Sequence, residues 1–261
     1  MRRDSNAYII GFATTVCLVC SIVVSTSAVA LRERQDRNKV LDRQTQVLVV
    51  AGLLEVGQKA SPEDVESLFE ENIQIRVIDL ETGEYEDSIE SSTYDQRKAT
   101  KDPAVSRSAP ANNAGLTRLP NNALVYQRVK DDAVQSLILP IEGKGLWSTL
   151  YGFIALAPDT TTIQGITFYE HGETPGLGGE VDNPNWKALW VGRQAYDHDW
   201  APAIEVIKGA AGPVAEDPYR VDGLSGSTLT ARGVTNLVQF WLGENGFDPY
   251  LEKLRSEGSG S

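Results

Sequence analysis

The chain has 261 residues, of which 36 are acidic and 24 are basic, and its net charge at neutral pH is −12. This charge argues against nucleic acid as a partner, because nucleic acid binding requires a basic surface. The length allows one sizeable domain with an additional segment, or two small domains. Two cysteines are too few for a disulfide framework, and two isolated histidines, His171 and His198, do not suggest a zinc site.

The first apolar run predicts a membrane-spanning helix. No charged residue occurs between Asp4 and Arg32. A helix over residues 7–31 would be about 37 Å long, which is enough to cross a hydrocarbon core of about 30 Å. We therefore expect a short tail at residues 1–6 and a transmembrane helix at residues 7–31. Both cysteines lie inside this run, where apolar helix residues are a simpler interpretation than a redox pair.

A cleavable signal peptide is the alternative interpretation. Arg2 and Arg3 supply a basic start, and Ala28-Val29-Ala30 resembles a cleavage site. The apolar run is nevertheless longer than the about 7–15 residues that are usual in signal peptides. Basic residues also follow the run, so a simple positive-inside count would place the large domain in the cytoplasm, although long domains can override this bias. The charge pattern alone leaves the orientation open.

The segment after the apolar run predicts helix, turn, helix and strand. Residues 32–54 predict a helix that continues out of the membrane. Ser61 provides an N-cap and Pro62 a first helical position for a second helix that ends near Glu71. Residues 73–80 are rich in β-branched side chains and predict a strand.

The middle of the chain predicts an antiparallel sheet. Residues 85–118 are polar and predict a long surface excursion with some helix near residues 95–99, or disorder. Short apolar runs then alternate with tight turns, as in antiparallel strands. These runs cover residues 124–129, 134–140, 149–157 and 162–168.

Two glycine-rich segments interrupt this pattern. Residues 141–147 end in Trp147, a side chain that either fills the core or forms a platform for a ligand. Residues 169–180 form either a wide turn or a backbone wall against a flat ligand, with Leu177 packing on the face of that ligand.

The last predicted elements follow in short succession. They are a helix capped by Asn183 that carries Trp186 and Trp190, a strand at residues 204–207, and helices at residues 229–242 and 248–255. The whole pattern predicts an α+β domain at residues 32–256, with an antiparallel sheet and flanking helices, and a mobile tail at residues 257–261.

The most informative stretch is Asp222-Gly223-Leu224-Ser225-Gly226-Ser227-Thr228. Its glycines let the backbone approach a ligand closely. The apolar run that follows predicts a helix, and the N–H groups and dipole at a helix start attract phosphate. We therefore expect a phosphorylated ligand at Thr228. The sequence has neither a G-x-G-x-x-G motif that opens a βαβ unit nor a P-loop, so a nucleotide would not bind by those routes.

This stretch resembles the acceptor motif for covalent flavin in the FMN-binding domains of bacterial respiratory complexes. Further segments are similar to the C subunits of the sodium-translocating NADH:quinone oxidoreductases. These segments are residues 5–8, 41–42, 143–148, 173–178 and 186–190. The resemblance implies that a flavin transferase takes FMN from FAD and esterifies its phosphate to Thr228. It also implies an electron-transfer subunit of a complex in the bacterial inner membrane that oxidises NADH, reduces ubiquinone and exports sodium ions, with the flavin domain on the periplasmic side.

The resemblance also assigns roles around the acceptor. It implies that Asp222 belongs to the signature that the transferase recognises, and that Ser225 and Gly226 shape the phosphate turn. Lys208 would balance charge near the flavin, or is an ordinary surface charge. Ser227 departs from the family pattern, which usually has Ala before the acceptor Thr, and its hydroxyl is a second possible attachment point.

The isoalloxazine ring would touch residues outside this stretch. By resemblance these residues are Trp147, Thr174, Leu177 and Gly178. Electron transfer through a bound flavin needs no general base, nucleophile or metal set from the protein. Two other functions remain open at this point: the G subunit of the related Rnf complex, which exchanges electrons with ferredoxin, and a membrane-anchored assembly protein without a cofactor.

Overall fold

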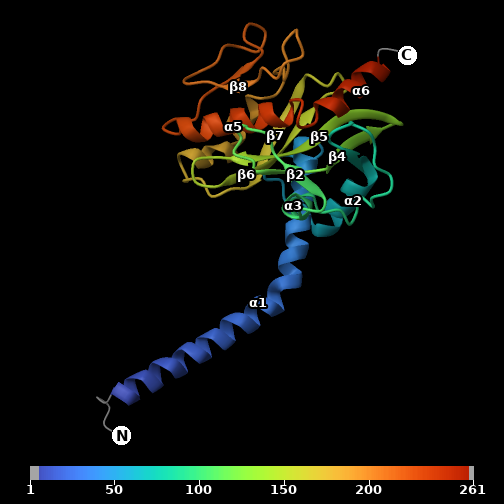
Figure 1. Ribbon diagram of the computed structural model, residues 1–261. Coiled ribbons are helices and arrows are strands. Elements are labelled where there is room, and N and C mark those ends of the chain that lie inside the picture. Colours follow the sequence, from blue (N-terminus) through green and yellow to red (C-terminus); the bar gives the residue numbers. More distant parts are fainter. Residues whose placement is uncertain (1–5, 259–261) are drawn as a thin grey trace. The chain divides into compact units, whose positions relative to one another are not determined.

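The computed structural model describes residues 6–258, and the chain divides into two compact units, one ending at Arg43 and the other beginning at Gln44. Helix α1 (Asn6–Val50) belongs to both units (Figure 1). By length and composition it is a helix that could cross a membrane. The predicted helix end at residue 54 is wrong by four residues, because Gly52 adopts a φ of +69° and the chain leaves the helix there.

The second unit is built on a five-stranded antiparallel sheet with the order β1-β4-β5-β6-β7. The strands are β1 (Ile73–Asp79), β4 (Asn122–Lys130), β5 (Ala133–Lys144), β6 (Thr149–Leu156) and β7 (Ile163–Glu170). The predicted antiparallel sheet is confirmed. β5 runs four residues beyond its predicted end at Pro140, because its pairing with β4 stops at Ile138 and the missing N–H of the proline is not needed there.

One face of the sheet is covered by α5 (Thr228–Trp241), which lies across the strands in Figure 1. It buries Val234, Leu237 and Val238 completely. The helix approaches the end of β5 closely, since a Cβ on Gly233 would lie 2.5 Å from the Lys144 carbonyl oxygen. α6 (Asp248–Gly258) follows it.

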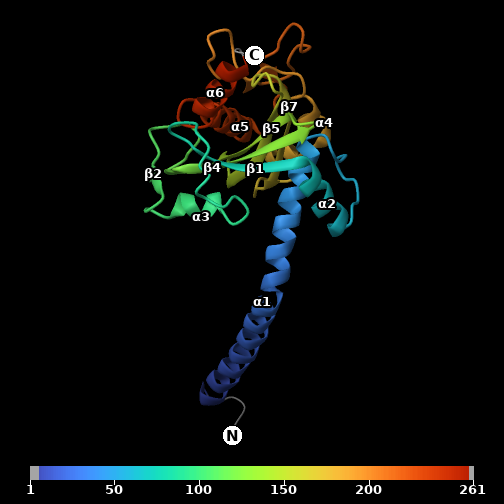
Figure 2. The ribbon, with the colours of Figure 1, turned by 90° about the vertical axis from the view of Figure 1, so that its right-hand side faces the viewer.

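The other face of the sheet is covered by the last turns of α1 and by α2 (Pro62–Asn72), which Figure 2 shows on the side away from α5. Leu48 is fully buried, and Phe69 packs edge-on against Tyr126 of β4. The predicted start of α2 is confirmed: Ser61 forms a capping box with Asp64, and Pro62 is the first helical residue.

The polar stretch at residues 85–118 is ordered: the predicted helix near residues 95–99 is confirmed, and the alternative of disorder is excluded. It contains α3 (Gln96–Lys101), capped by Asp95, and two short paired strands, β2 (Ser106–Ser108) and β3 (Arg118–Pro120). Ala114 in this stretch and Leu119 just after it are fully buried, and the Tyr94 hydroxyl donates to the Asn122 carbonyl of β4, so the stretch is fixed on the domain.

The remaining elements are short and lie between β7 and α5 in the sequence. They are η1 (Gly178–Asp182), α4 (Pro184–Ala188) with Asn183 as N-cap, and the parallel pair β8 (Glu205–Val206) and β9 (Arg220–Val221). Residues 1–5 and 259–261, which make up most of the two predicted tails, lie outside the described residues.

Candidate functional site

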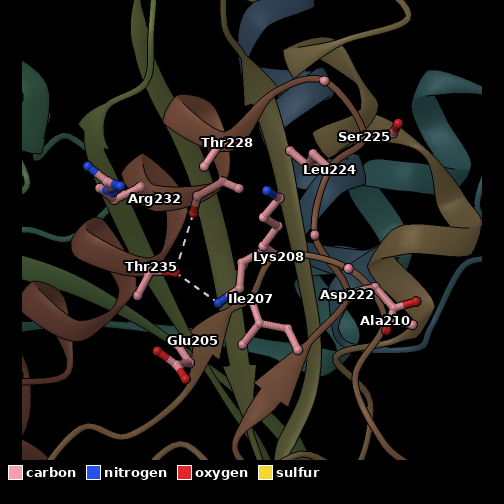
Figure 3. Close-up of a pocket in the computed structure, with 15 residues that line it drawn as sticks. Glu205, Ile207, Lys208, Ala210, Asp222, Leu224, Ser225, Thr228, Arg232 and Thr235 are labelled. Carbon is pink, nitrogen blue, oxygen red and sulfur yellow. Dashed lines mark hydrogen bonds between the residues drawn. The ribbon is translucent and has the colours of Figure 1, made fainter.

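A cavity of about 690 Å³ lies beside the start of α5 (Figure 3). Three segments line it: residues 205–210, residues 222–226, and the residues of α5 at positions 228, 231, 232 and 235. Its volume is within the range of about 300–1,000 Å³ that is usual for small-molecule sites. Thr235 joins two of the segments, because its hydroxyl accepts a hydrogen bond from the Val206 N–H at 2.8 Å.

The hydroxyl-rich turn, residues 222–228, packs tightly on the neighbouring loop. The N–H of Gly223 donates to the Gly209 carbonyl at 2.8 Å, and a Cβ on Gly223 would lie only 2.3 Å from the Ile207 carbonyl oxygen. Gly226 has a φ of +71°, and a Cβ there would lie 3.0 Å from Leu177 Cδ2. Gly223 is therefore required by its contact with backbone, and Gly226 by its left-handed backbone.

The four hydroxyls near the start of α5 differ in access. Ser227 is only 5% exposed and Thr230 is fully buried. The Thr230 hydroxyl donates to the Glu173 carboxylate at 2.6 Å. Ser225 and Thr228 are exposed, and both line the cavity. Figure 3 shows the Ser225 side chain pointing away from Lys208.

The start of α5 is suited to an anion. Ser227 occupies the N-cap position but makes no side-chain capping hydrogen bond. The N–H groups of a first helical turn have no partner within the helix, and a side-chain cap normally serves one of them. Here an anionic ligand can take that place, supported by the helix dipole.

Two cations, Lys208 and Arg232, line the cavity, and Figure 3 shows the Arg232 guanidinium pointing away from Lys208. Figure 3 shows Lys208 extended toward the space between Thr228 and Leu224. Arg232 lies one turn after Thr228 and so shares its face of α5.

The two carboxylates that line the cavity, those of Glu205 and Asp222, already have partners within the protein. Glu205 pairs with Arg220 at 3.3 Å, and the Asp222 carboxylate accepts a hydrogen bond from the Ala211 N–H at 2.9 Å. Lys208 and the helix start together favour a phosphate beside Thr228.

Glu173 is a buried carboxylate at the centre of the surrounding loops, only 5% exposed. It accepts backbone hydrogen bonds from Leu146 at 3.2 Å, Trp147 at 2.9 Å and Ser148 at 3.1 Å, besides that from Thr230. Burial alone raises the pKa of Glu173, but the hydrogen bonds from Thr230 and the three backbone N–H groups outweigh it and lower the pKa. Glu173 is therefore ionised at neutral pH.

Five of the ten predicted site residues line the cavity: Lys208, Asp222, Ser225, Gly226 and Thr228. Ser227 is buried beneath it, and Leu177 stands beside Gly226 with 44% of its surface exposed. Trp147 is 72% exposed, which excludes the interpretation that it fills the core.

The other two predicted residues shape the second glycine-rich loop. The Thr174 carbonyl accepts the N–H groups of Leu177 and Gly179, at 3.1 and 2.9 Å. Gly178 is buried, and a Cβ on it would lie 2.6 Å from the Thr230 hydroxyl.

The sequence assigned no role to Glu173, Arg232 or Thr235. Arg232 could have been found from its helical spacing of four residues after Thr228. For Glu173 no local signal exists, since its partners come from other parts of the chain.

Comparison with known proteins defines the class first. The family model described as "FMN-binding domain" matches residues 145–243. This range includes Glu173, the hydroxyl-rich turn and α5. The cavity, the turn and the uncapped helix thus belong to an FMN-binding domain.

Relatives along the whole chain then define the family. The C subunit of the Na(+)-translocating NADH-quinone reductase of Pseudomonas aeruginosa is 47% identical over 97% of this chain and 98% of its own length. The corresponding protein of Vibrio vulnificus is 46% identical over 98% of each chain. The crystal structure of NqrC from Shewanella oneidensis has a TM-score of 0.77 and 33% identity, covering 85% of this chain and 99% of that one. The chain belongs to the family of C subunits of the Na(+)-translocating NADH-quinone reductases.

This membership confirms the resemblance inferred from the sequence. It makes the chain a component of an oxidoreductase complex. It also favours that family over the Rnf G subunit and over an assembly protein without a cofactor.

Proposed function

We propose that this chain is the electron-transferring C subunit of a sodium-translocating NADH:quinone oxidoreductase, with FMN esterified through its phosphate to Thr228. The observation that carries the proposal is the exposed Thr228 hydroxyl at the uncapped start of α5, on a cavity shared with Lys208 and Arg232. Bound FMN would supply the redox chemistry, through its isoalloxazine ring.

The placement of the hydroxyls supports Thr228 as the attachment point. Thr230 is buried with its hydroxyl donated to Glu173, and Ser227 is 5% exposed. Ser225 is exposed, but it precedes the helix start and points away from Lys208 (Figure 3). Thr228 combines an accessible hydroxyl with the N–H groups of the helix start and with Lys208, which extends toward it, so Ser227 is the weaker choice.

The electrostatics of the cavity support a phosphodiester. Such a linkage keeps one negative charge, and a helix dipole stabilises a charge at its N-terminus by about 0.3–1 kcal/mol. Lys208 and Arg232 add positive charge in a chain whose net charge is −12. The two acidic residues of the lining, Glu205 and Asp222, already have partners, which leaves the positive charge of Lys208 for an anion.

The apolar lining supports a flat ring beside the phosphate. Ile207 and Leu224 line the cavity, and Leu177 projects at its rim beside Gly226. Trp147 is exposed on a loop that Glu173 joins to the same helix. Leu177 and Trp147 are thus exposed apolar side chains that an isoalloxazine ring could contact.

The membrane location is also part of the proposal. The apolar part of α1 would cross the bacterial inner membrane, and the family implies that the flavin domain faces the periplasm. Electrons would pass to and from other subunits of the complex, and a flavin transferase would attach the cofactor. Protease added to intact spheroplasts is expected to digest the domain; an uncut domain would instead place it in the cytoplasm.

Intact mass spectrometry tests the attachment. Protein co-produced with the transferase is expected to carry an addition of about 440 Da, the mass of FMN less water. Thr228→Val should lack this addition, while Ser227→Ala, the matched control, should keep it. A Thr228→Val protein that retains its flavin would show that the attachment point is wrong.

A further inference from the structure

Two glycines, Gly145 and Gly178, leave the space that the Glu173 carboxylate occupies. A Cβ on Gly145 would lie 2.6 Å from Glu173 Oε1, and a Cβ on Gly178 would lie 2.9 Å from Oε2. Any side chain at either position would displace the carboxylate. The backbone on both sides is therefore shaped around this group.

The same carboxylate joins three segments that are distant in the sequence. Its Oε1 accepts the N–H groups of Trp147 and Ser148 in the loop between β5 and β6. Its Oε2 accepts the Thr230 hydroxyl in the first turn of α5. Glu173 itself belongs to the loop that carries Leu177. Each of the three segments contributes a residue that the sequence assigns to the flavin site.

A hydrogen bond also fixes the main chain at Glu173. Its N–H donates to His171 Nδ1 at 3.2 Å, and the His171 Nε2 lies 2.7 Å from the Asp182 carboxylate. An acceptor at Nδ1 requires the tautomer with its proton on Nε2, which then donates to Asp182. The position of the carboxylate is thus fixed by its own main chain and by five hydrogen-bond donors, since the Ser148 hydroxyl also donates to Oε1, at 3.4 Å.

We propose that the Glu173 carboxylate is the positioning residue of the flavin ring: it holds the Trp147 loop and Leu177 in one arrangement relative to Thr228. This inference rests on the proposed attachment of FMN to Thr228. Glu173 does not act in the attachment, because its oxygens are buried and occupied by donors other than Thr228. It determines how the ring is seated once the phosphate is linked.

The first test uses the protein without flavin, as the Thr228→Val variant. The amides of Leu146, Trp147 and Ser148 should be protected from hydrogen exchange, because they donate to a buried carboxylate. Glu173→Gln preserves shape but removes the charge and turns an NH₂ group toward two donors. We expect about ten- to hundredfold faster exchange at these amides, as for the loss of hydrogen bonds to a charged group.

The second test uses the flavin-loaded protein. In Glu173→Gln the mass addition should remain, because the attachment point is unchanged. The flavin should become more accessible to quenching by iodide. Its midpoint potential should rise, because a negative charge near the ring is lost. Glu180→Gln is the matched control: it makes the same change in the following 3₁₀ helix, where the Glu180 carboxylate accepts a hydrogen bond from the Asn183 side chain. The control should leave potential and quenching unchanged.

Thr230 provides a second variant should Glu173→Gln fold poorly. Thr230→Val removes the donor at 2.6 Å and should shift the potential and the quenching in part, while Thr230→Ser keeps the hydroxyl and should restore both. A flavin that stays attached with wild-type potential and accessibility in Glu173→Gln and Thr230→Val overturns the inference. Absence of flavin from the wild-type Thr228 is a different result, which refutes the proposed function itself.

Discussion

Of the two glycines inside the hydroxyl-rich turn, Gly223 has less space around it. A Cβ there would lie 2.3 Å from the Ile207 carbonyl oxygen and 3.1 Å from the Gly209 N, and both atoms belong to the backbone. Backbone atoms cannot rotate away as a flexible side chain can. The contact therefore fixes the distance between the turn and the loop that carries Lys208.

Gly223→Ala is expected to destabilise the domain by about 1–3 kcal/mol, as overpacking of a well-filled region does. The free energy of unfolding from urea titration measures this. Gly172→Ala is the control, since the nearest atom to its Cβ would be Ser148 Cβ at 3.3 Å, and its loss should be smaller. Equal losses in the two variants would contradict this account of Gly223.

At the scale of single residues, the sequence could identify Thr228 as the proposed acceptor, but it could not identify the residues that surround it. Thr228 and the turn glycines stand in one contiguous stretch, whose composition points to a phosphate at a helix start. The buried state of Thr230 depends on Glu173, 57 residues away in the chain. No local pattern contains that contact, so neither the exclusion of Thr230 nor the role of Glu173 could be predicted.

At the scale of secondary structure, α3 contacts β6 and β7 close to the loops that carry Trp147 and Glu173. Glu142 of β5, Tyr151 of β6 and Glu170 of β7 are successive cross-strand partners. Arg97 of α3 binds Glu170 at 2.7 and 3.0 Å and lies 3.6 Å from the centre of the Tyr151 ring. The polar stretch that carries α3 thus supports the site.

Glu142→Gln is expected to stabilise the domain at neutral pH. Burial raises the pKa of Glu142, and the nearby Arg97 and Lys101 lower it only in part. A raised pKa means that the folded state favours the protonated form, so ionisation at pH 7 opposes folding. The gain should disappear as the pH falls below the ordinary glutamate value of 4.5, where both states are protonated.

Thermal unfolding of both proteins between pH 4 and pH 8 measures this effect. Glu170→Gln is the comparison variant, because its carboxylate pairs with Arg97 and its loss should lower the stability at pH 7. A Glu142→Gln protein that is less stable than the wild type at pH 7 would disprove the assignment.

The regular elements could be predicted because their residues alternate or repeat locally. The strands at residues 124–129 and 149–157 follow from short apolar runs bounded by turn residues. The helix near residues 95–99 could be predicted, but the pairing of β2 with β3 could not, because this segment is fixed by residues such as Ala114 and Leu119 that are buried in the domain. Pairing partners, and not composition, decide that β5 continues past Pro140.

At the scale of the whole molecule, the end of α1 belongs to the domain and not to the membrane segment. The compact unit begins at Gln44, and Val47, Leu48 and Val50 are buried in it. The Gln46 side chain accepts a hydrogen bond from Thr167 of β7 at 2.7 Å. These residues therefore form part of the cover on the face of the sheet opposite α5.

A chain that begins at Gln44 is therefore expected to fold as a water-soluble domain. A chain that begins at Ala51 should lose stability by more than the about 2–5 kcal/mol of a single large-to-small core substitution, because it lacks three buried side chains. Gel filtration and urea unfolding of the two chains measure the difference. Equal stability would show that residues 44–50 are not part of the core.

The open rim of the cavity has a chemical consequence for the cofactor. Thr228 is exposed, as are Leu177 at 44% and Trp147 at 72%. Enzymes prevent side reactions of reactive groups by closing the site against solvent, and nothing within the described residues covers this rim. A reduced flavin held there would meet dissolved oxygen directly, so the isolated protein would lose its electrons to air unless another protein surface shields the ring during turnover.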